Sequence, residues 1–148
     1  MTLATARLVK QFYDTVWNEA DEEAARRILA ADFRFRGSLG PEKFGPEGFI
    51  AYMRSVHRAL GSYTCTIEQL VASGDRVAAR MRFKGWHQAE FFDVAATQRE
   101  IEWAGAAFFR IEQDKIAELW VLGDIDSVKA QLGAEASTDF TVDGTGAD

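Results

Sequence analysis

Cysteine and proline are scarce in this chain of 148 residues, and basic side chains do not outnumber acidic ones. The single cysteine, Cys65, excludes an intramolecular disulfide framework and a structural zinc site built from several cysteines. With only 2 prolines and 27% charged residues, the chain is not of the disordered class. Its net charge of −6 disfavours a nucleic-acid partner, because phosphate binding needs clustered basic side chains.

Long apolar runs and cofactor motifs are missing as well. No run of about 18 apolar residues occurs, so we expect no membrane span. Residues 1–4 lack a basic region followed by an apolar stretch, so we expect no signal peptide and a cytoplasmic protein. No glycine-rich phosphate loop precedes a predicted helix. The two histidines, His57 and His87, would need acids from elsewhere to hold a metal ion, so neither a metal nor a cofactor is expected.

Apolar side chains are abundant, and in the first third of the chain they repeat at helical spacing. They make up 47% of the residues and include 11 Phe and 4 Trp, enough for a dense core or an apolar pocket. Spacings of three and four predict a helix over residues 8–17. Asp21 is a good N-cap for a second helix that buries Ala25, Ile28 and Leu29. Pro46 suits the first turn of a third helix, whose apolar face runs from Phe49 to Leu60.

The remainder of the chain has a period of two, which is typical of strands. We predict strands at about 63–72, 76–91, 99–111 and 116–124, and a short helix at 127–132 that ends at Gly133. Residues 134–148 are expected to be a flexible tail. Helices followed by antiparallel strands indicate one α+β domain over residues 1–133. Three N-terminal helices would pack on a strongly curved, mostly antiparallel sheet and enclose a cone-shaped interior.

Alternation along the strands assigns candidate residues to two faces. His87 shares the apolar face of its strand with Phe83, whereas the basic residues of that strand share the opposite face, which we interpret as solvated or subunit-facing. On the strand at 116–124, Glu118, Trp120 and Asp124 lie on one face together with Ile116 and Leu122. If that face points inward, the two acids stand in an apolar wall, although a β-bulge would shift the register. Local signals alone favour Asp124 as the cap of the last helix and His87 as an ordinary core histidine.

Several short stretches, taken in their order and spacing, are similar to one known family. They are Phe12-Tyr13-Asp14-Thr15-Val16-Trp17-Asn18-Glu19, Ala31-Asp32-Phe33, Gly45-Pro46-Glu47-Gly48-Phe49, Ser73-Gly74-Asp75-Arg76-Val77-Ala78, Gly85-Trp86-His87, Lys115-Ile116-Ala117-Glu118-Leu119-Trp120 and Gln131-Leu132-Gly133. Together they resemble the SnoaL-like polyketide cyclase family of the NTF2-like superfamily, over about residues 5–133. The resemblance implies a cone-shaped α+β barrel with a deep apolar pocket, usually in a homodimer. It also implies cofactor-free aldol ring closure of an aromatic polyketide ester.

The resemblance also implies roles for individual residues. Asp124 matches the acid–base group and His87 a pocket-lining histidine, while Trp17, Phe33 and Trp120 match pocket-wall positions. The predicted pocket wall is completed by residues from the apolar faces and by one acid: Tyr13, Met53, Phe83, Trp103 and Glu118. An aspartate in an apolar wall would be a stronger base than one in water, and a neutral histidine beside it could donate to a developing enolate oxygen.

The chain departs from the family pattern at two places. The stretch 89–99 lacks three glycines and a proline of the family loop but keeps Phe91, Thr97 and Arg99, so we expect different turns there. Phe109 and Arg110 stand in a region where the cyclases carry a histidine.

Three functions remain open at this point. The first is a cofactor-independent cyclase or isomerase with aspartate-based chemistry on an apolar, polyketide-like ester or ketone. The second is a non-catalytic NTF2-like protein that binds an apolar small molecule. The third is a dimerisation module whose outer sheet face carries the function. Apolar residues on both faces of the strand at 99–111 predict a covered outer face, and hence a homodimer, under all three.

Overall fold

Helices occupy the first part of the chain and strands most of the rest. The computed structural model describes residues 2–38 and 41–133, so the predicted tail at 134–148 lies outside the described residues. In order, the elements are α1 (Thr2–Gln11), the π-helical segment η1 (Phe12–Trp17), α2 (Glu22–Ile28), β1 (Leu29–Arg36), β2 (Lys43–Phe44), α3 (Gly45–Ala59), β3 (Leu60–Ser73), β4 (Arg76–His87), β5 (Glu100–Glu112), β6 (Lys115–Gly123) and α4 (Ile125–Leu132). This order confirms the predicted α+β class.

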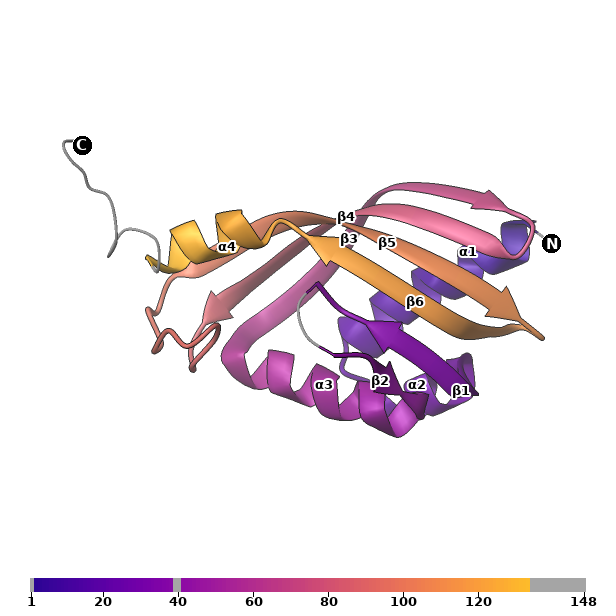
Figure 1. The fold of residues 1–148 in the computed structure, drawn as a ribbon, viewed down its shortest axis with the longest axis horizontal. Coiled ribbons are helices and arrows are strands. Elements are labelled where there is room, and N and C mark those ends of the chain that lie inside the picture. Colours follow the sequence, from indigo (N-terminus) through magenta and orange to yellow (C-terminus); the bar gives the residue numbers. More distant parts are fainter. Residues whose placement is uncertain (1, 39–40, 134–148) are drawn as a thin grey trace.

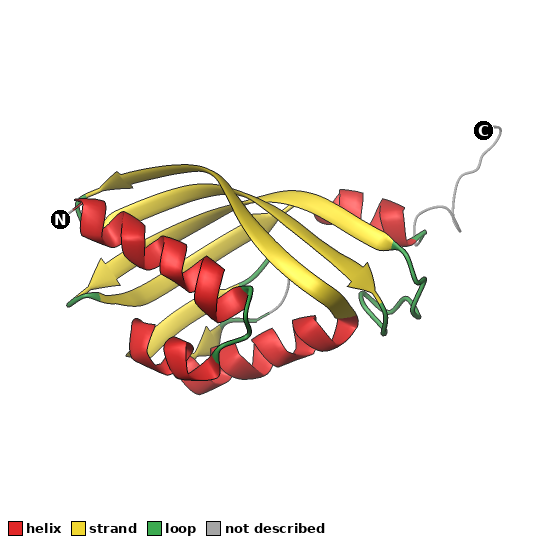
Figure 2. Ribbon diagram, turned by 180° about the vertical axis from the view of Figure 1, so that it is seen from behind, coloured by secondary structure: helices red, strands yellow, loops and turns green. Residues whose placement is uncertain are grey.

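The strands form one curled sheet, with helices α1, α2 and α3 on its inner side (Figures 1 and 2). Its strand order is β2-β1-β6-β5-β4-β3, and the pairings are antiparallel except for the parallel pair β1–β6. The edge strands β2 and β3 do not pair with each other among the described residues, so the predicted cone is a curled sheet that stays open. Helix α4 lies at one end of the sheet, away from the other helices (Figure 1).

Local signals predicted several element ends correctly. The Asp21 side chain accepts a hydrogen bond from the Ala24 amide and caps α2. Gly133 adopts the left-handed conformation after α4, with φ of 83°. Three boundaries were wrong. Leu29 begins β1 and Leu60 begins β3, instead of lying on the buried faces of the preceding helices, and β4 ends at His87 instead of residue 91. The second strand stops early because residues 88–98 turn back and pair with its end.

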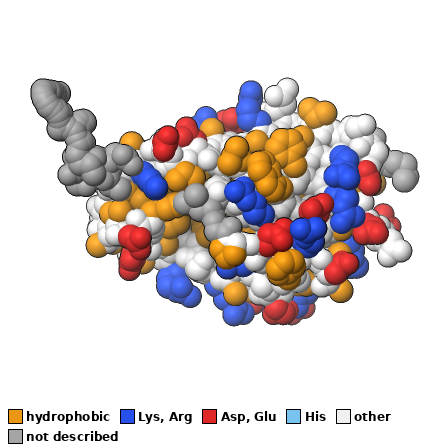
Figure 3. All heavy atoms as spheres, in the orientation of Figure 1, with side chains coloured by type: hydrophobic (Ala, Val, Ile, Leu, Met, Phe, Trp, Pro, Cys, Tyr) orange, Lys and Arg blue, Asp and Glu red, His pale blue; other side chains and the backbone are white. Residues whose placement is uncertain are grey.

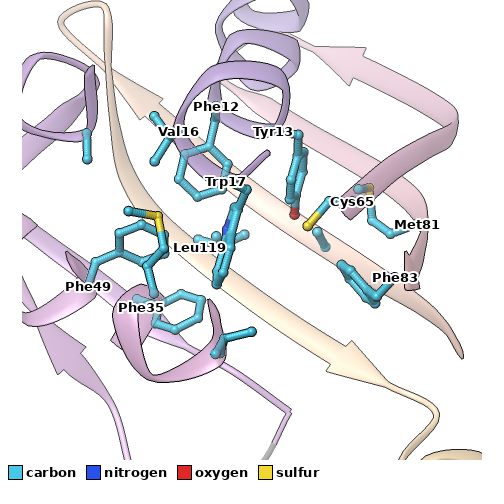
Figure 4. Close-up of a cluster of buried hydrophobic side chains, with 14 of the residues drawn as sticks. Phe12, Tyr13, Val16, Trp17, Phe35, Phe49, Cys65, Met81, Phe83 and Leu119 are labelled. Atoms are coloured by element: carbon cyan, nitrogen blue, oxygen red, sulfur yellow. The ribbon is translucent and has the colours of Figure 1, made fainter. Parts of the chain in front are cut away.

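Aromatic rings fill the space between the helices and the sheet (Figure 4). The ring of Phe12 lies 5.4 Å from that of Phe49 on α3 and 5.8 Å from that of Phe109 on β5. The second of these contacts is edge-to-face, a geometry that adds roughly 0.5–1.5 kcal/mol to the gain from burial. The core thus joins both helical segments to the sheet and leaves room at the end of the cone near α4.

A β-bulge in β6 decides which of its side chains face this core. Arg110 pairs with Glu118 while Ile111 pairs with Ile116, so Ala117 is the additional residue. Beyond the bulge, Leu119 faces the core and Trp120 the outer side. The expectation that Glu118 and Trp120 share the interior face is therefore wrong, because one extra residue exchanges the two faces of a strand.

Apolar side chains also gather on the outer face of the sheet. Phe108, Trp120 and Leu122 are 50%, 40% and 51% exposed, and they form an orange patch over β5 and β6 in Figure 3. The Phe108 and Trp120 ring centroids lie 5.8 Å apart. The guanidinium of Arg36 lies 5.1 Å from the centroid of the Trp120 ring. We call Phe108, Trp120 and Leu122 the outer patch.

Candidate functional site

A cavity of about 610 Å³ opens between the end of α3, the loop after β4 and the start of α4. We call it the outer cavity. Its aromatic wall consists of Tyr52, Phe91, Phe92 and Trp103, and its charged groups are Arg58, Glu90 and Asp93. Ligand sites in proteins span about 300–1,000 Å³ and combine apolar walls with a few polar groups. The outer cavity is thus large enough for a small organic molecule.

A second, inner cavity of only about 60 Å³ lies deeper in the cone. Seven aromatic side chains dominate its wall: Tyr13, Trp17, Phe35, Tyr52, Tyr63, Phe83 and Trp103. Burial raises the pKa values of the Tyr13, Tyr52 and Tyr63 hydroxyls above the ordinary tyrosine value. These phenols therefore stay neutral and can donate hydrogen bonds, but they are poor bases. The deep part of the cone is filled mainly by aromatic rings.

The structure brings together four of the predicted wall residues. Tyr13, Trp17, Phe83 and Trp103 all line the inner cavity. Two others, Phe33 and Met53, are buried in the core without lining either cavity. Glu118 and Trp120 instead line a hollow on the outer face of the sheet, together with Phe108 of the outer patch.

Asp124 directly follows β6 and is exposed. Its Oδ1 accepts a hydrogen bond from the Ser127 amide at 3.1 Å, so the carboxylate caps α4. The residue after it, Ile125, lines the outer cavity, and the residue before it, Gly123, lies against Trp103. Asp124 thus stands between two residues that lie at the cavity wall, although its own side chain is not part of that wall.

His87 is fully buried at the end of β4. The Thr97 amide donates to its Nδ1 at 3.1 Å, and the Thr97 hydroxyl oxygen lies 2.9 Å from the same atom. The amide contact makes Nδ1 an acceptor and places the proton of the neutral ring on Nε2, which has no partner in the described part of the chain. His87 and Asp124 do not meet in one cavity, since neither side chain lines the outer or the inner one.

His87 instead contacts the segment that forms one wall of the outer cavity. The backbone of His87 pairs with Gln98 and Arg99, so residues 88–98 form a loop whose two ends meet at the end of β4. Between them, the loop carries Phe91 and Phe92 to the cavity. The ring of Phe91 lies 6.4 Å from that of His87 and 6.4 Å from that of Trp103. His87 therefore packs against Phe91 and helps to position this wall of the outer cavity.

Several wall residues were missed by sequence reasoning. Tyr52 follows Phe49 by three positions and precedes Val56 by four, so helical spacing could have found it. Tyr63 alternates with Cys65 on β3 and could have been found from the strand period. Phe91 and Phe92 lie in a loop, where no periodic signal exists.

Across residues 2–38 and 41–133, no group of three or more His, Cys, Asp or Glu side chains could hold a metal ion. In the same part of the chain, every helix is too short or too polar to cross a membrane.

Comparison with known proteins identifies the family. The profile of the SnoaL-like polyketide cyclase family matches residues 7–132. No curated protein matches the chain. A candidate SnoaL-like polyketide cyclase from Jannaschia sp. CCS1 superposes with a TM-score of 0.83 at 18% identity, covering 90% of this chain and 94% of that chain.

Two similar structures come from Streptomyces. TsrD from Streptomyces laurentii has a TM-score of 0.81 and 25% identity, covering 91% of this chain and 98% of that chain. The candidate polyketide cyclase IdmH from Streptomyces antibioticus has a TM-score of 0.77 and 25% identity, covering 87% and 98%. The fold is thus NTF2-like, and because the family profile spans most of its length, the chain belongs to the SnoaL-like polyketide cyclase family.

Proposed function

We propose that this protein is a cofactor-independent, cyclase-type enzyme that acts on an apolar, polyketide-like ester or ketone in the outer cavity. The observation that carries the proposal is a ligand-sized cavity walled by Tyr52, Phe91, Phe92 and Trp103 in a member of this family. Flat aromatic substrates pack well against such rings. The similarity to IdmH, itself a candidate polyketide cyclase, supports the same reaction class.

Aldol ring closure begins with removal of a proton beside a carbonyl group, and Asp124 is the proposed base. One carboxylate oxygen, Oδ1, is engaged by the Ser127 amide. The other, Oδ2, accepts no hydrogen bond from the described residues and is free to take the proton. The next residue, Ile125, lines the outer cavity, so a substrate bound there would lie close to this carboxylate.

Tyr52 is the proposed donor to the enolate oxygen that forms after proton removal. It lines both cavities, and burial raises the pKa of its hydroxyl, so the phenol keeps its proton at neutral pH. A neutral donor held in a preformed wall stabilises developing negative charge. His87, whose Nδ1 is engaged by Thr97, is proposed to hold the cavity wall and not to touch the substrate.

Replacement of Asp124 by asparagine tests this proposal. Asparagine caps helices about as well as aspartate, so Asp124→Asn keeps α4 but removes the base. Against a panel of aromatic polyketide esters and cyclic ketones, we expect turnover to fall by about 10²–10⁴-fold, the usual contribution of a general base. The matched control is Asp21→Asn, which changes the N-cap of α2 in the same way. Full activity of Asp124→Asn on a confirmed substrate would show that Asp124 is not the base.

The second candidate function is non-catalytic binding of an apolar small molecule. The exposed position of Asp124 and its use as a helix cap favour this alternative. It predicts that a bound polyketide ester is recovered unchanged, and that Asp124→Asn leaves the affinity for that ester as it was. Calorimetry of both proteins with the same ester, followed by mass spectrometry of the recovered ligand, distinguishes binding from catalysis.

A further inference from the structure

The outer and inner cavities meet at Trp103. Ser38, Tyr52 and Trp103 line both of them. The Trp103 ring lies 5.5 Å from that of Phe83 in the inner wall and 6.4 Å from that of Phe91 in the outer wall. The whole residue is only 8% exposed, so the indole stands between the two spaces as a partition.

Close neighbours hold the indole in this place. A Cβ atom on Gly123 would lie 3.1 Å from Nε1 of Trp103 and 2.8 Å from Oγ of Ser38, so only glycine leaves the room that both side chains use. The same hydroxyl of Ser38 accepts a hydrogen bond from the Gly123 amide at 2.6 Å. Gly123 at the end of β6 therefore packs against the indole, and Ser38, two residues after β1, is hydrogen-bonded to the same glycine.

The volumes of the two cavities differ by an order of magnitude, and this difference limits the size of the group that each cavity can bind. The inner cavity, about 60 Å³, is far below the roughly 150 Å³ of an engineered cavity that binds benzene. A single aromatic ring does not fit there, whereas the outer cavity of about 610 Å³ can hold fused rings.

We infer that Trp103 is a specificity-determining residue that acts as a size filter. It confines the ring system of the substrate to the outer cavity and admits only a short alkyl group to the inner one. The substrate class is thus a compact aromatic ester or ketone that carries a small alkyl substituent. This inference rests on the proposed function, because it takes the outer cavity as the substrate site.

Two fluorescent probes that differ only in one substituent test the filter. They are 6-methyl-2-naphthoate, whose methyl group fits the inner cavity, and 6-phenyl-2-naphthoate, whose phenyl group does not. The full chain is titrated with each probe, and the ratio of the two Kd values is compared. We expect the parent protein to prefer the methyl probe and Trp103→Ala to shift the ratio by about tenfold or more toward the phenyl probe. Trp103→Phe, which keeps an aromatic ring in the core, should shift it in the same direction by less.

The control is Trp120→Ala, because Trp120 lines neither cavity and should leave the ratio as in the parent. A thermal melt of each variant shows whether it is folded, and Trp103→Phe decides the question if Trp103→Ala is not. An unchanged ratio in a folded Trp103 variant would overturn the size filter. Failure of all proteins to bind either probe would overturn it together with the outer cavity as substrate site. A shifted ratio without turnover of any ester would uphold the filter and contradict only the proposed catalysis.

Discussion

At the scale of single residues, Cys65 offers a direct test of how closed the core is. Its thiol lies on β3 beside the Tyr13 hydroxyl (Figure 4) and is buried. Burial raises the pKa of this thiol well above its ordinary value, so the reactive thiolate is scarce in the folded protein. At pH 8 we expect a disulfide reagent such as dithiobis-nitrobenzoate to react very slowly with the folded chain and within seconds in denaturant.

Because the chain has 1 cysteine, the absorbance trace of this reaction reports on that site alone. Rapid modification without denaturant would mean that the layer between η1 and the sheet opens readily. Slow modification at a rate that follows unfolding would instead measure how often the whole core opens.

Some residue roles could be predicted from the sequence and others could not. The caps at Asp21 and Asp124 were visible because an N-cap depends on an amide only three residues away. The outward direction of Trp120 was not visible, since it results from the bulge at Ala117, which depends on pairing with another strand. The engagement of His87 by Thr97 was also beyond prediction, because it needs the path of a loop with no periodic pattern.

At the scale of elements, the two hairpin turns differ in how well their residues suit them. In the β3–β4 turn, Gly74 takes the left-handed conformation with φ of 59°. In the β5–β6 turn, Gln113 and Asp114 do so with φ of 51° and 63°. Side chains in this region cost about 1–2 kcal/mol, and Asn-Gly is the preferred pair in such turns.

We therefore expect the double variant Gln113→Asn/Asp114→Gly to be more stable than the parent by about 1 kcal/mol. Urea denaturation followed by tryptophan fluorescence measures the change. Gly74→Ala is the matched opposite and should lose about 1 kcal/mol, because its φ is one that alanine adopts poorly. A lower midpoint for the double variant would show that the present side chains stabilise the turn in another way.

The loop at 88–98 also uses left-handed residues, but at the cavity. Phe92 and Asp93 have φ of 51° and 61° where the family pattern has glycines nearby. The path of this loop was not predictable, because the aromatic pair Phe91-Phe92 is typical of a strand by composition. Pairing of Gln98 with His87 overrides that preference.

At the scale of the whole molecule, we propose that a second copy of the chain covers the outer patch. Three large apolar side chains lie exposed there, and contiguous patches of this kind often mark interaction sites. We expect the parent to sediment as a dimer and Leu122→Glu to sediment as a monomer, since a carboxylate buried against apolar side chains is strongly unfavourable. Leu3→Glu is the control, because Leu3 is exposed on α1, away from the outer face. A parent that stays monomeric at all concentrations would contradict the proposal.

The overall architecture was predictable to a greater degree than the cavities. Helices followed by strands of period two indicate an α+β fold whatever the details of packing. The division of the interior into two cavities depends on how the rings of Phe35, Phe83 and Trp103 pack against one another. It also depends on glycines such as Gly123, which leave room for side chains beside them. The spacing of residues along the chain does not predict this packing.

The parallel pairing of β1 with β6 has a consequence for how the chain is made. Arg34 pairs with Glu118 and Arg36 with Trp120. A strand from the first quarter of the chain can therefore complete its pairing only after the last strand of the sheet has been made. Contacts between such distant segments form late, because a long loop must first be closed. During synthesis on the ribosome, the edge of β1 that pairs with β6 therefore stays unpaired until β6 has emerged. A nascent chain paused before β6 should be a good substrate for chaperones, because unpaired strand edges are prone to aggregate.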